Sequence, residues 1–238
     1  MNVPNNQISF NITFITYTLI AIALFLALAS VAGQYLRFIY SGDYFIKLIQ
    51  VFYLDREKNI PTYFCMLILL LAALILAFIS VLEKARRSHY LSRWIILALG
   101  FLVMSADEGF QLHEKLTNPF KGFLVQGEQG IFYFAWVIPG IAIVILIGSF
   151  FIRFLLYLPK LVRYRFIAAA ILYLGGAIGF ELISGKYAEL YGMDNWIYSM
   201  VLTTVEESLE MIGIIFFIWA LLKYCEDNFK QVTIHFKA

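Results

Sequence analysis

The stretch WIILALGFLVMSADEGFQLHEKL, residues 94–116, joins an apolar run directly to a group of acidic residues. Residues 94–104 are apolar except for one glycine, as in a helix that lies in hydrocarbon. They are followed by Asp107, Glu108, His113 and Glu114. An ionised acid in the middle of a membrane span costs roughly 2.5–3.5 kcal/mol. The stretch therefore indicates a membrane helix that carries acidic groups for a functional reason.

The composition of the whole chain agrees with a location in the membrane. Of its 238 residues, 62% are hydrophobic and only 14% are charged, and the mean hydropathy is +0.80. Soluble domains are closer to about half apolar and about a quarter charged. The net charge of +2 gives no reason to expect a nucleic-acid partner, and two cysteines do not make a disulfide framework. We therefore expect a multipass membrane protein.

The apolar runs define the expected architecture. A bilayer core requires about 20 apolar residues of helix, and six runs meet this requirement: 13–35, 61–82, 93–115, 131–156, 164–185 and 197–222. The segment 43–59 is too polar to span, and its aromatic and aliphatic residues favour a short interfacial helix after the first span. No repeat or long linker divides the chain. We expect an all-α polytopic membrane protein that forms a single transmembrane domain over residues 1–238, with six transmembrane helices.

The distribution of Lys and Arg predicts the orientation of these spans. With six spans, both termini lie on one side of the membrane. That side holds most of the basic residues, including the compact cluster Lys84, Arg86 and Arg87. Because cytoplasmic loops carry an excess of Lys and Arg, we expect both termini in the cytoplasm.

Acidic residues from three predicted spans fall in the outer half of the membrane. The third and fifth spans carry them near their outer ends, and the sixth carries them about 15–20 Å along the helix from its start. These residues are Asp107, Glu108, Glu114, Glu181, Glu206, Glu207 and Glu210. Residues four or seven apart share a helix face, so we expect Asp107, Gln111 and Glu114 on one face. Glu206 and Glu210 share a face for the same reason.

This concentration of acids predicts a metal site. No basic residue lies at the same depth in any predicted span, because Lys115 and Lys186 stand at the outer ends. The acids must then be balanced by protons, by a water-filled cavity or by bound metal cations. Carboxylates with one imidazole suit a divalent metal such as Mg, Mn, Fe or Zn. The predicted ligands are Asp107, Glu114, Glu206 and Glu210, followed by His113 and Glu181.

Several functions remain compatible with such a site. A divalent metal lowers the pKa of bound water, and Glu207 or Glu108 would then serve as the general base. The protein would be a metal-dependent hydrolase, or another enzyme, acting on a lipid or lipid-linked substrate from the outer leaflet. The alternatives are a proton- or cation-coupled transporter and a non-catalytic subunit of a membrane complex. The inner halves of the spans carry few polar residues, and this favours a local site over a continuous channel.

The acidic motifs also carry a resemblance. The pattern Asp107-Glu108, His113-Glu114, Phe180-Glu181 and then Glu206-Glu207 with Glu210 resembles an uncharacterised family of bacterial multipass membrane proteins. The resemblance covers residues 94–222 and implies no known activity. It does imply a location in the bacterial inner membrane.

Overall fold

The computed structural model describes residues 11–39, 49–112 and 130–229, and every regular element in these ranges is helical. The α-helices are α1 (Ile12–Ile39), α3 (Ile60–Ala85), α4 (Leu91–Phe110), α6 (Val137–Tyr157), α7 (Lys160–Leu174), α8 (Glu181–Tyr191) and α9 (Thr203–Asn228). Two π-helical turns, η2 (Gly175–Phe180) and η3 (Ile197–Leu202), run directly into α8 and α9. A short 3-10 helix, η1 (Gly130–Phe132), precedes α6.

Within the described residues, five helical segments are long and apolar enough to cross a membrane: Ile12–Ile39, Ile60–Ala85, Val137–Tyr157, Lys160–Tyr191 and Ile197–Asn228. They correspond to five of the six predicted spans. The remaining predicted span corresponds to α4, whose apolar run is interrupted by Arg93, Asp107 and Glu108. The helices therefore fit an all-helical multipass membrane protein, and the sixth span stays a prediction.

The helix α4 ends earlier than the sequence suggested, at Phe110 rather than at residue 115. Gln111 adopts the left-handed conformation with φ 55° and ψ 47°, and its N–H donates to the Asp107 carbonyl oxygen at 2.7 Å. Residues beyond this cap no longer follow the screw of α4. The regular helix therefore does not continue through Gln111, and the expected face of Asp107, Gln111 and Glu114 stays a prediction. His113 and Glu114 lie outside the described residues.

The predicted interfacial helix after the first span lies partly outside the described residues, which begin again at Ile49. Residues 51–59 form turns that pack back onto the bundle. The Leu54 N–H donates to Ser30 Oγ of α1 at 3.2 Å. Asn59 Oδ1 accepts from the Thr62 N–H at 3.1 Å and so caps the start of α3. The interfacial helix itself stays a prediction.

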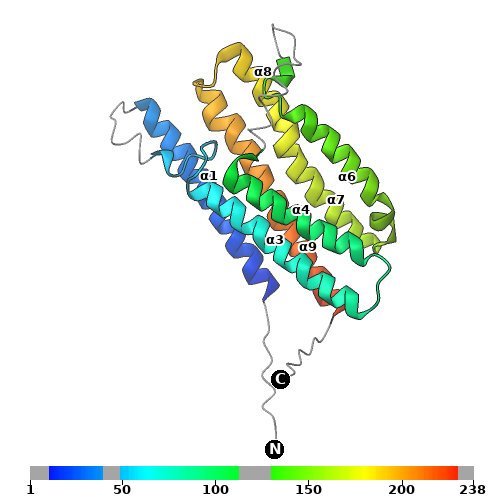
Figure 1. Cartoon of the computed structure of the whole chain (residues 1–238). Coiled ribbons are helices and arrows are strands. Elements are labelled where there is room, and N and C mark those ends of the chain that lie inside the picture. The colour runs from blue at the N-terminus through cyan, green and yellow to red at the C-terminus, as the bar shows by residue number, and fades with distance from the viewer. Residues whose placement is uncertain (1–10, 40–48, 113–129, 230–238) are drawn as a thin grey trace, which may run out of the picture.

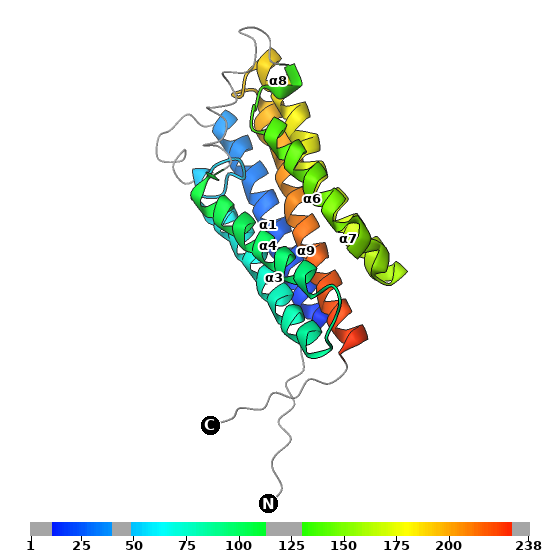
Figure 2. The ribbon, with the colours of Figure 1, turned by 45° about the vertical axis from the view of Figure 1, so that its right-hand side comes forward.

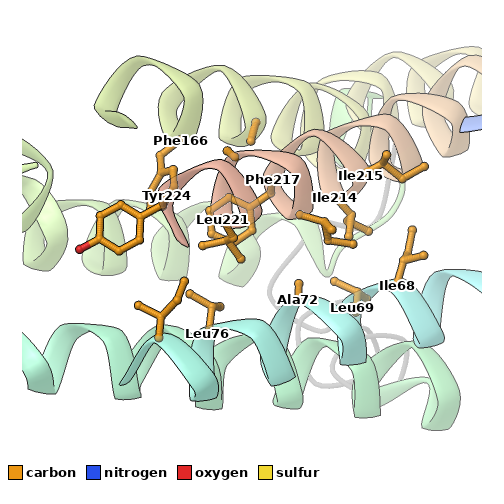
Figure 3. Close-up of a cluster of buried hydrophobic side chains, with 14 of the residues drawn as sticks. Ile68, Leu69, Ala72, Leu76, Phe166, Ile214, Ile215, Phe217, Leu221 and Tyr224 are labelled. Carbon is orange, nitrogen blue, oxygen red and sulfur yellow. The ribbon is translucent and has the colours of Figure 1, made fainter. Parts of the chain in front are cut away.

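The core of the bundle forms around α9, which contacts α1, α3 and α7 (Figures 1 and 2). Its apolar side chains meet those of α3 and α7 in a continuous cluster that includes Ile68, Leu69, Ala72, Leu76, Phe166, Ile214, Ile215, Phe217 and Leu221 (Figure 3). Gly213 allows α7 and α9 to approach closely, because a Cβ there would lie 2.6 Å from the Tyr173 backbone nitrogen. Small residues promote such packing between membrane helices, where dispersion contacts replace the hydrophobic effect.

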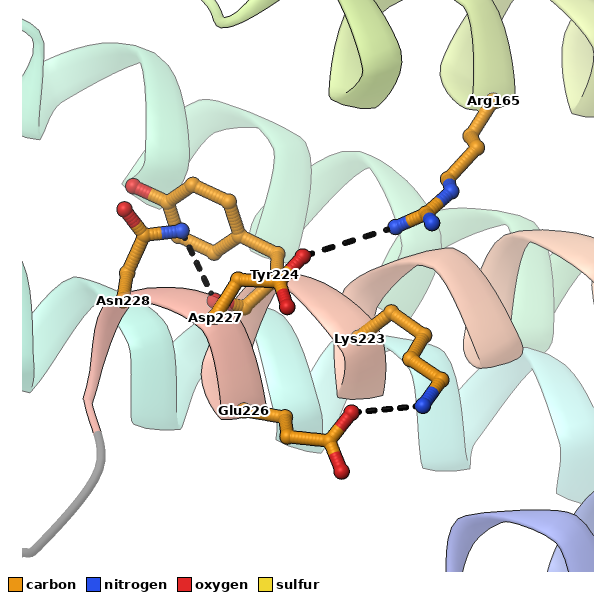
Figure 4. A network of polar contacts seen from close by, with 6 residues as sticks. All are labelled: Arg165, Lys223, Tyr224, Glu226, Asp227 and Asn228. Atoms are coloured by element: carbon orange, nitrogen blue, oxygen red, sulfur yellow. Dashed lines mark hydrogen bonds and ion pairs between the residues drawn. The ribbon is translucent and has the colours of Figure 1, made fainter.

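The two ends of the bundle differ in their polar residues. At the end where α3 and α9 terminate, called the basic end here, Arg165 pairs with Asp227 at 3.7 Å and Lys223 pairs with Glu226 (Figure 4). Asn228 Nδ2 donates to the Tyr224 carbonyl oxygen at 2.9 Å. The opposite end, where α1 terminates and α3 and η3 begin, is called the acidic end. The predicted site residues within the described part of the chain lie toward this acidic end.

Candidate functional site

Two glutamates from different helices meet near the acidic end. Glu181 is the first residue of α8, and Glu206 lies in the first turn of α9. Their carboxyl groups are within hydrogen-bonding reach of each other. Trp136 Nε1 donates to Glu181 Oε1 at 2.8 Å, and Ser184 Oγ donates to Glu206 Oε2 at 2.9 Å. We call these two residues the carboxyl pair.

The carboxyl pair has neutral hydrogen-bond donors around it. An ionised carboxylate has only acceptor oxygens, so two carboxyl groups can form a hydrogen bond only if one of them carries a proton. Sharing one proton also avoids placing two like charges side by side. Trp136 and Ser184 are neutral donors, and no Lys or Arg in the described ranges forms an ion pair with either glutamate. Lys186, close in sequence, instead pairs with Glu189 at 3.0 Å.

The backbone around the pair is adapted to bring the two helices together. Each glutamate follows a π-helical turn, η2 before Glu181 and η3 before Glu206. Such turns insert an extra residue into a helix and are frequent at functional sites. Gly176 of η2 is buried, and a Cβ there would lie 2.6 Å from the Glu206 carbonyl oxygen and 2.8 Å from Glu210 Cγ. Only a glycine permits this approach without displacement of η2 from α9.

Further carboxyl groups surround the pair. Glu206 interacts electrostatically with Glu207 and Glu210, and both of these residues interact with Glu108 of α4. Glu207 and Glu210 also lie within electrostatic range of Glu181. The structure therefore brings acidic side chains from α4, α8 and α9 into one region. We call Glu108, Glu181, Glu206, Glu207 and Glu210 the carboxyl cluster.

Not every predicted ligand joins this cluster closely. Asp107 lies within electrostatic range of Tyr173, as do Glu108 and Glu210. His113 and Glu114 lie outside the described residues. Within the described ranges, no group of three or more His, Cys, Asp or Glu side chains is placed to hold a metal ion. The described residues therefore do not by themselves make a metal centre, and the metal ligands remain a prediction.

Sequence reasoning missed the donors that hold the pair. Trp136 is 45 residues from Glu181, and no local pattern links the two. Ser184 stands three residues after Glu181, but small polar residues are common in membrane helices, so its position gave no signal. Glu83, another buried acid, was also overlooked. It lies at the basic end, where Tyr224 Oη donates to its Oε1 at 2.9 Å.

The fold and the cluster together define a class: a helical membrane protein with carboxyl groups gathered in one half of the bundle. The chain belongs to the family described as Domain of unknown function (DUF8692), which matches residues 17–225. This agrees with the expected membership in an uncharacterised family, whereas the acidic motifs and the bacterial origin stay predictions. No curated protein and no solved structure matches the chain.

Proposed function

We propose that the chain is an integral membrane enzyme in which the carboxyl pair, Glu181 and Glu206, performs general acid–base chemistry on a lipid or lipid-linked substrate. The observation that supports this proposal is the carboxyl–carboxyl contact with neutral donors on either side. A pair that shares one proton contains one group that gives a proton and one that takes it. Both glutamates are only half-buried, so a substrate can reach them.

A local site agrees better with the surroundings than a transport path does. Beyond the carboxyl cluster, α9 continues into the apolar core, where Met211, Ile214, Ile215 and Ile218 are at most 2% exposed. A proton-coupled transporter needs polar or hydrated groups on both sides of its proton site. The one-sided placement of the acids therefore favours chemistry within one half of the membrane.

The test reconstitutes the purified protein in liposomes made from a total lipid extract. Mass spectrometry would compare the lipids before and after incubation with wild type, Glu206→Gln and the exposed control Glu226→Gln. We expect at least one lipid species to change with wild type and with Glu226→Gln but not with Glu206→Gln. If no lipid changes and wild type instead carries a proton flux that Glu206→Gln abolishes, the enzyme proposal fails and transport replaces it.

A divalent-metal site is the second candidate. The observation that favours it is the carboxyl cluster itself, because Glu108, Glu207 and Glu210 lie within electrostatic range of one another. The donor set with Glu181, Glu206 and Glu210 would be completed by Asp107, His113 and Glu114. In a metal-dependent reaction, Glu207 or Glu108 would act as the general base. Elemental analysis of wild type beside Glu210→Ala tests it, and a metal-free wild-type protein after reconstitution with Mg, Mn, Fe and Zn would exclude it.

We also propose a location in the bacterial inner membrane with the basic end toward the cytoplasm. The support is the number of basic residues at that end, which include Arg86, Arg165 and Lys223. A membrane-impermeant thiol reagent applied to intact cells should not label Lys84→Cys. It should label Lys58→Cys at the acidic end, and the opposite pattern would reverse the orientation.

A further inference from the structure

A polar cleft opens at the acidic end, between the end of α1, the segment 49–58 and the end of α4. Its volume is about 460 Å³, and ligand pockets usually measure about 300–1,000 Å³. The charged lining consists of three basic residues, Arg37, Arg56 and Lys58, and two acidic residues, Asp55 and Glu57. The cleft lies where the helices give way to loops.

One polar group in the cleft wall is unsatisfied. Gln34 lines the cleft and is only 1% exposed, yet its Oε1 has no hydrogen-bond partner in the described part of the chain. Buried polar atoms in folded proteins are nearly always hydrogen-bonded, and an exception requires an explanation such as a ligand. An amide oxygen accepts hydrogen bonds only. A ligand that satisfies it must therefore carry an N–H or O–H donor.

The basic side chains of the cleft indicate that the ligand also carries an anionic group. Arg37 lies in the last turn of α1, and its ion pair with Asp194 is long, at 3.9 Å, between two exposed side chains. Arg56 and Lys58 are also exposed. Arg binds phosphate with two parallel hydrogen bonds.

We propose that this cleft binds a phosphate ester that carries a hydroxyl or ammonium group, as in the headgroup of a membrane phospholipid. The phosphate contacts Arg37, Arg56 and Lys58, and the donor group reaches Gln34 Oε1. Asp55 offers a further acceptor for an ammonium group. The inference goes beyond the proposed chemistry of the carboxyl pair and does not depend on it.

The cleft is nevertheless joined to the helix that carries Glu206. Tyr53 Oη donates to Asp55 Oδ2 at 3.0 Å, and the Tyr53 hydroxyl lies near Thr203, the first residue of α9. Burial, followed by the neighbouring Asp55, raises the pKa of the Tyr53 hydroxyl, so it stays protonated at neutral pH. A headgroup in the cleft would thus lie beside the start of α9.

The test measures the affinity of the detergent-purified full-length protein for short-chain phospholipids by thermophoresis. Phosphatidylethanolamine and phosphatidylglycerol have donors on their headgroups, whereas phosphatidylcholine has none. We expect at least one of the first two to bind about tenfold more tightly than phosphatidylcholine, the effect of one hydrogen bond to a buried acceptor. Ethanolamine phosphate, a soluble ester, forms a separate arm. If it binds as tightly as the lipid, the cleft serves a soluble phosphate ester with the same chemistry.

Substitutions distinguish the hydrogen bond to Gln34 from the contacts of the arginines with phosphate. Gln34→Met should abolish the preference over phosphatidylcholine, and Arg37→Gln or Arg56→Gln should weaken every lipid about tenfold. Arg153→Gln, an exposed change at the basic end, should leave all affinities unaltered. Equal binding of the three lipids to wild type would overturn the proposal, as would unchanged affinities in both arginine variants. Arg56 lies on an exposed turn, so Arg56→Gln should fold. Its affinities therefore test the proposal even if Gln34→Met does not fold.

Discussion

Replacement of Gly176 by alanine tests how α8 and α9 are held together at the carboxyl pair. The new Cβ would lie 2.6 Å from the Glu206 carbonyl oxygen, 2.8 Å from Glu210 Cγ and 3.2 Å from the Glu210 nitrogen. Two of these atoms belong to the backbone of α9 and cannot rotate away, so η2 must move outward. Overpacking of this kind destabilises a protein by about 1–3 kcal/mol. The same movement separates Glu181 from Glu206.

The neighbouring glycine supplies a matched control for this variant. A Cβ at Gly175 would meet nothing within 4 Å, so Gly175→Ala should leave stability unchanged or raise it by up to about 1 kcal/mol, as alanine does in helices. Thermal unfolding of the detergent-purified proteins, followed by near-UV circular dichroism, compares the two. At about 2–4 °C per kcal/mol, Gly176→Ala should melt about 2–12 °C below wild type. Equal melting temperatures for the two variants would refute the close approach of η2 to α9.

Three further substitutions test other contacts. Gly213→Ala should lower the melting temperature through a clash with the α7 backbone, at a cost of about 1–3 kcal/mol, whereas Gly148→Ala, whose Cβ has open space, should not. Tyr224→Phe removes the donor to the buried Glu83 and should reduce stability by about 1–3 kcal/mol in thermal unfolding; an unchanged melting temperature would contradict that hydrogen bond. Trp136→Phe removes the indole N–H that holds the carboxyl pair and should lower the lipid turnover proposed above, with the melting temperature as its control for folding.

The sequence predicted the helical architecture well because long apolar runs have few alternatives in a bilayer. Five predicted spans coincide with helices that can cross the membrane. The ends of elements were harder to predict. Nothing in the local sequence marks Gln111 for the left-handed conformation that ends α4, since glycine is the usual residue at such a cap. The π-helical turns before Glu181 and Glu206 likewise leave no signature in hydrophobic periodicity.

The candidate site was predictable in outline and not in its contacts. The position of each acid along its predicted span was enough to indicate that the acids of α4, α8 and α9 lie in the same half of the bundle. Which of them touch depends on the π-helical turns and on Gly176, whose role emerges only when η2 and α9 are placed together. The donor from Trp136 comes from a distant segment. The expectation of a metal rested on residue types, whereas the proposal of a shared proton rests on the proximity of Glu181 to Glu206.

Infrared spectroscopy of the purified protein tests most directly whether the carboxyl pair holds a proton. A protonated carboxyl group has a C=O band that shifts in heavy water, and exposed acids lose it above about pH 6 because their pKa values lie near 4. Wild type and the exposed control Glu226→Gln should retain such a band near neutral pH, and Glu206→Gln should lose intensity from it. A wild-type spectrum without a protonated carboxyl band at neutral pH, or a band that Glu206→Gln leaves unchanged, would contradict a proton shared between Glu181 and Glu206.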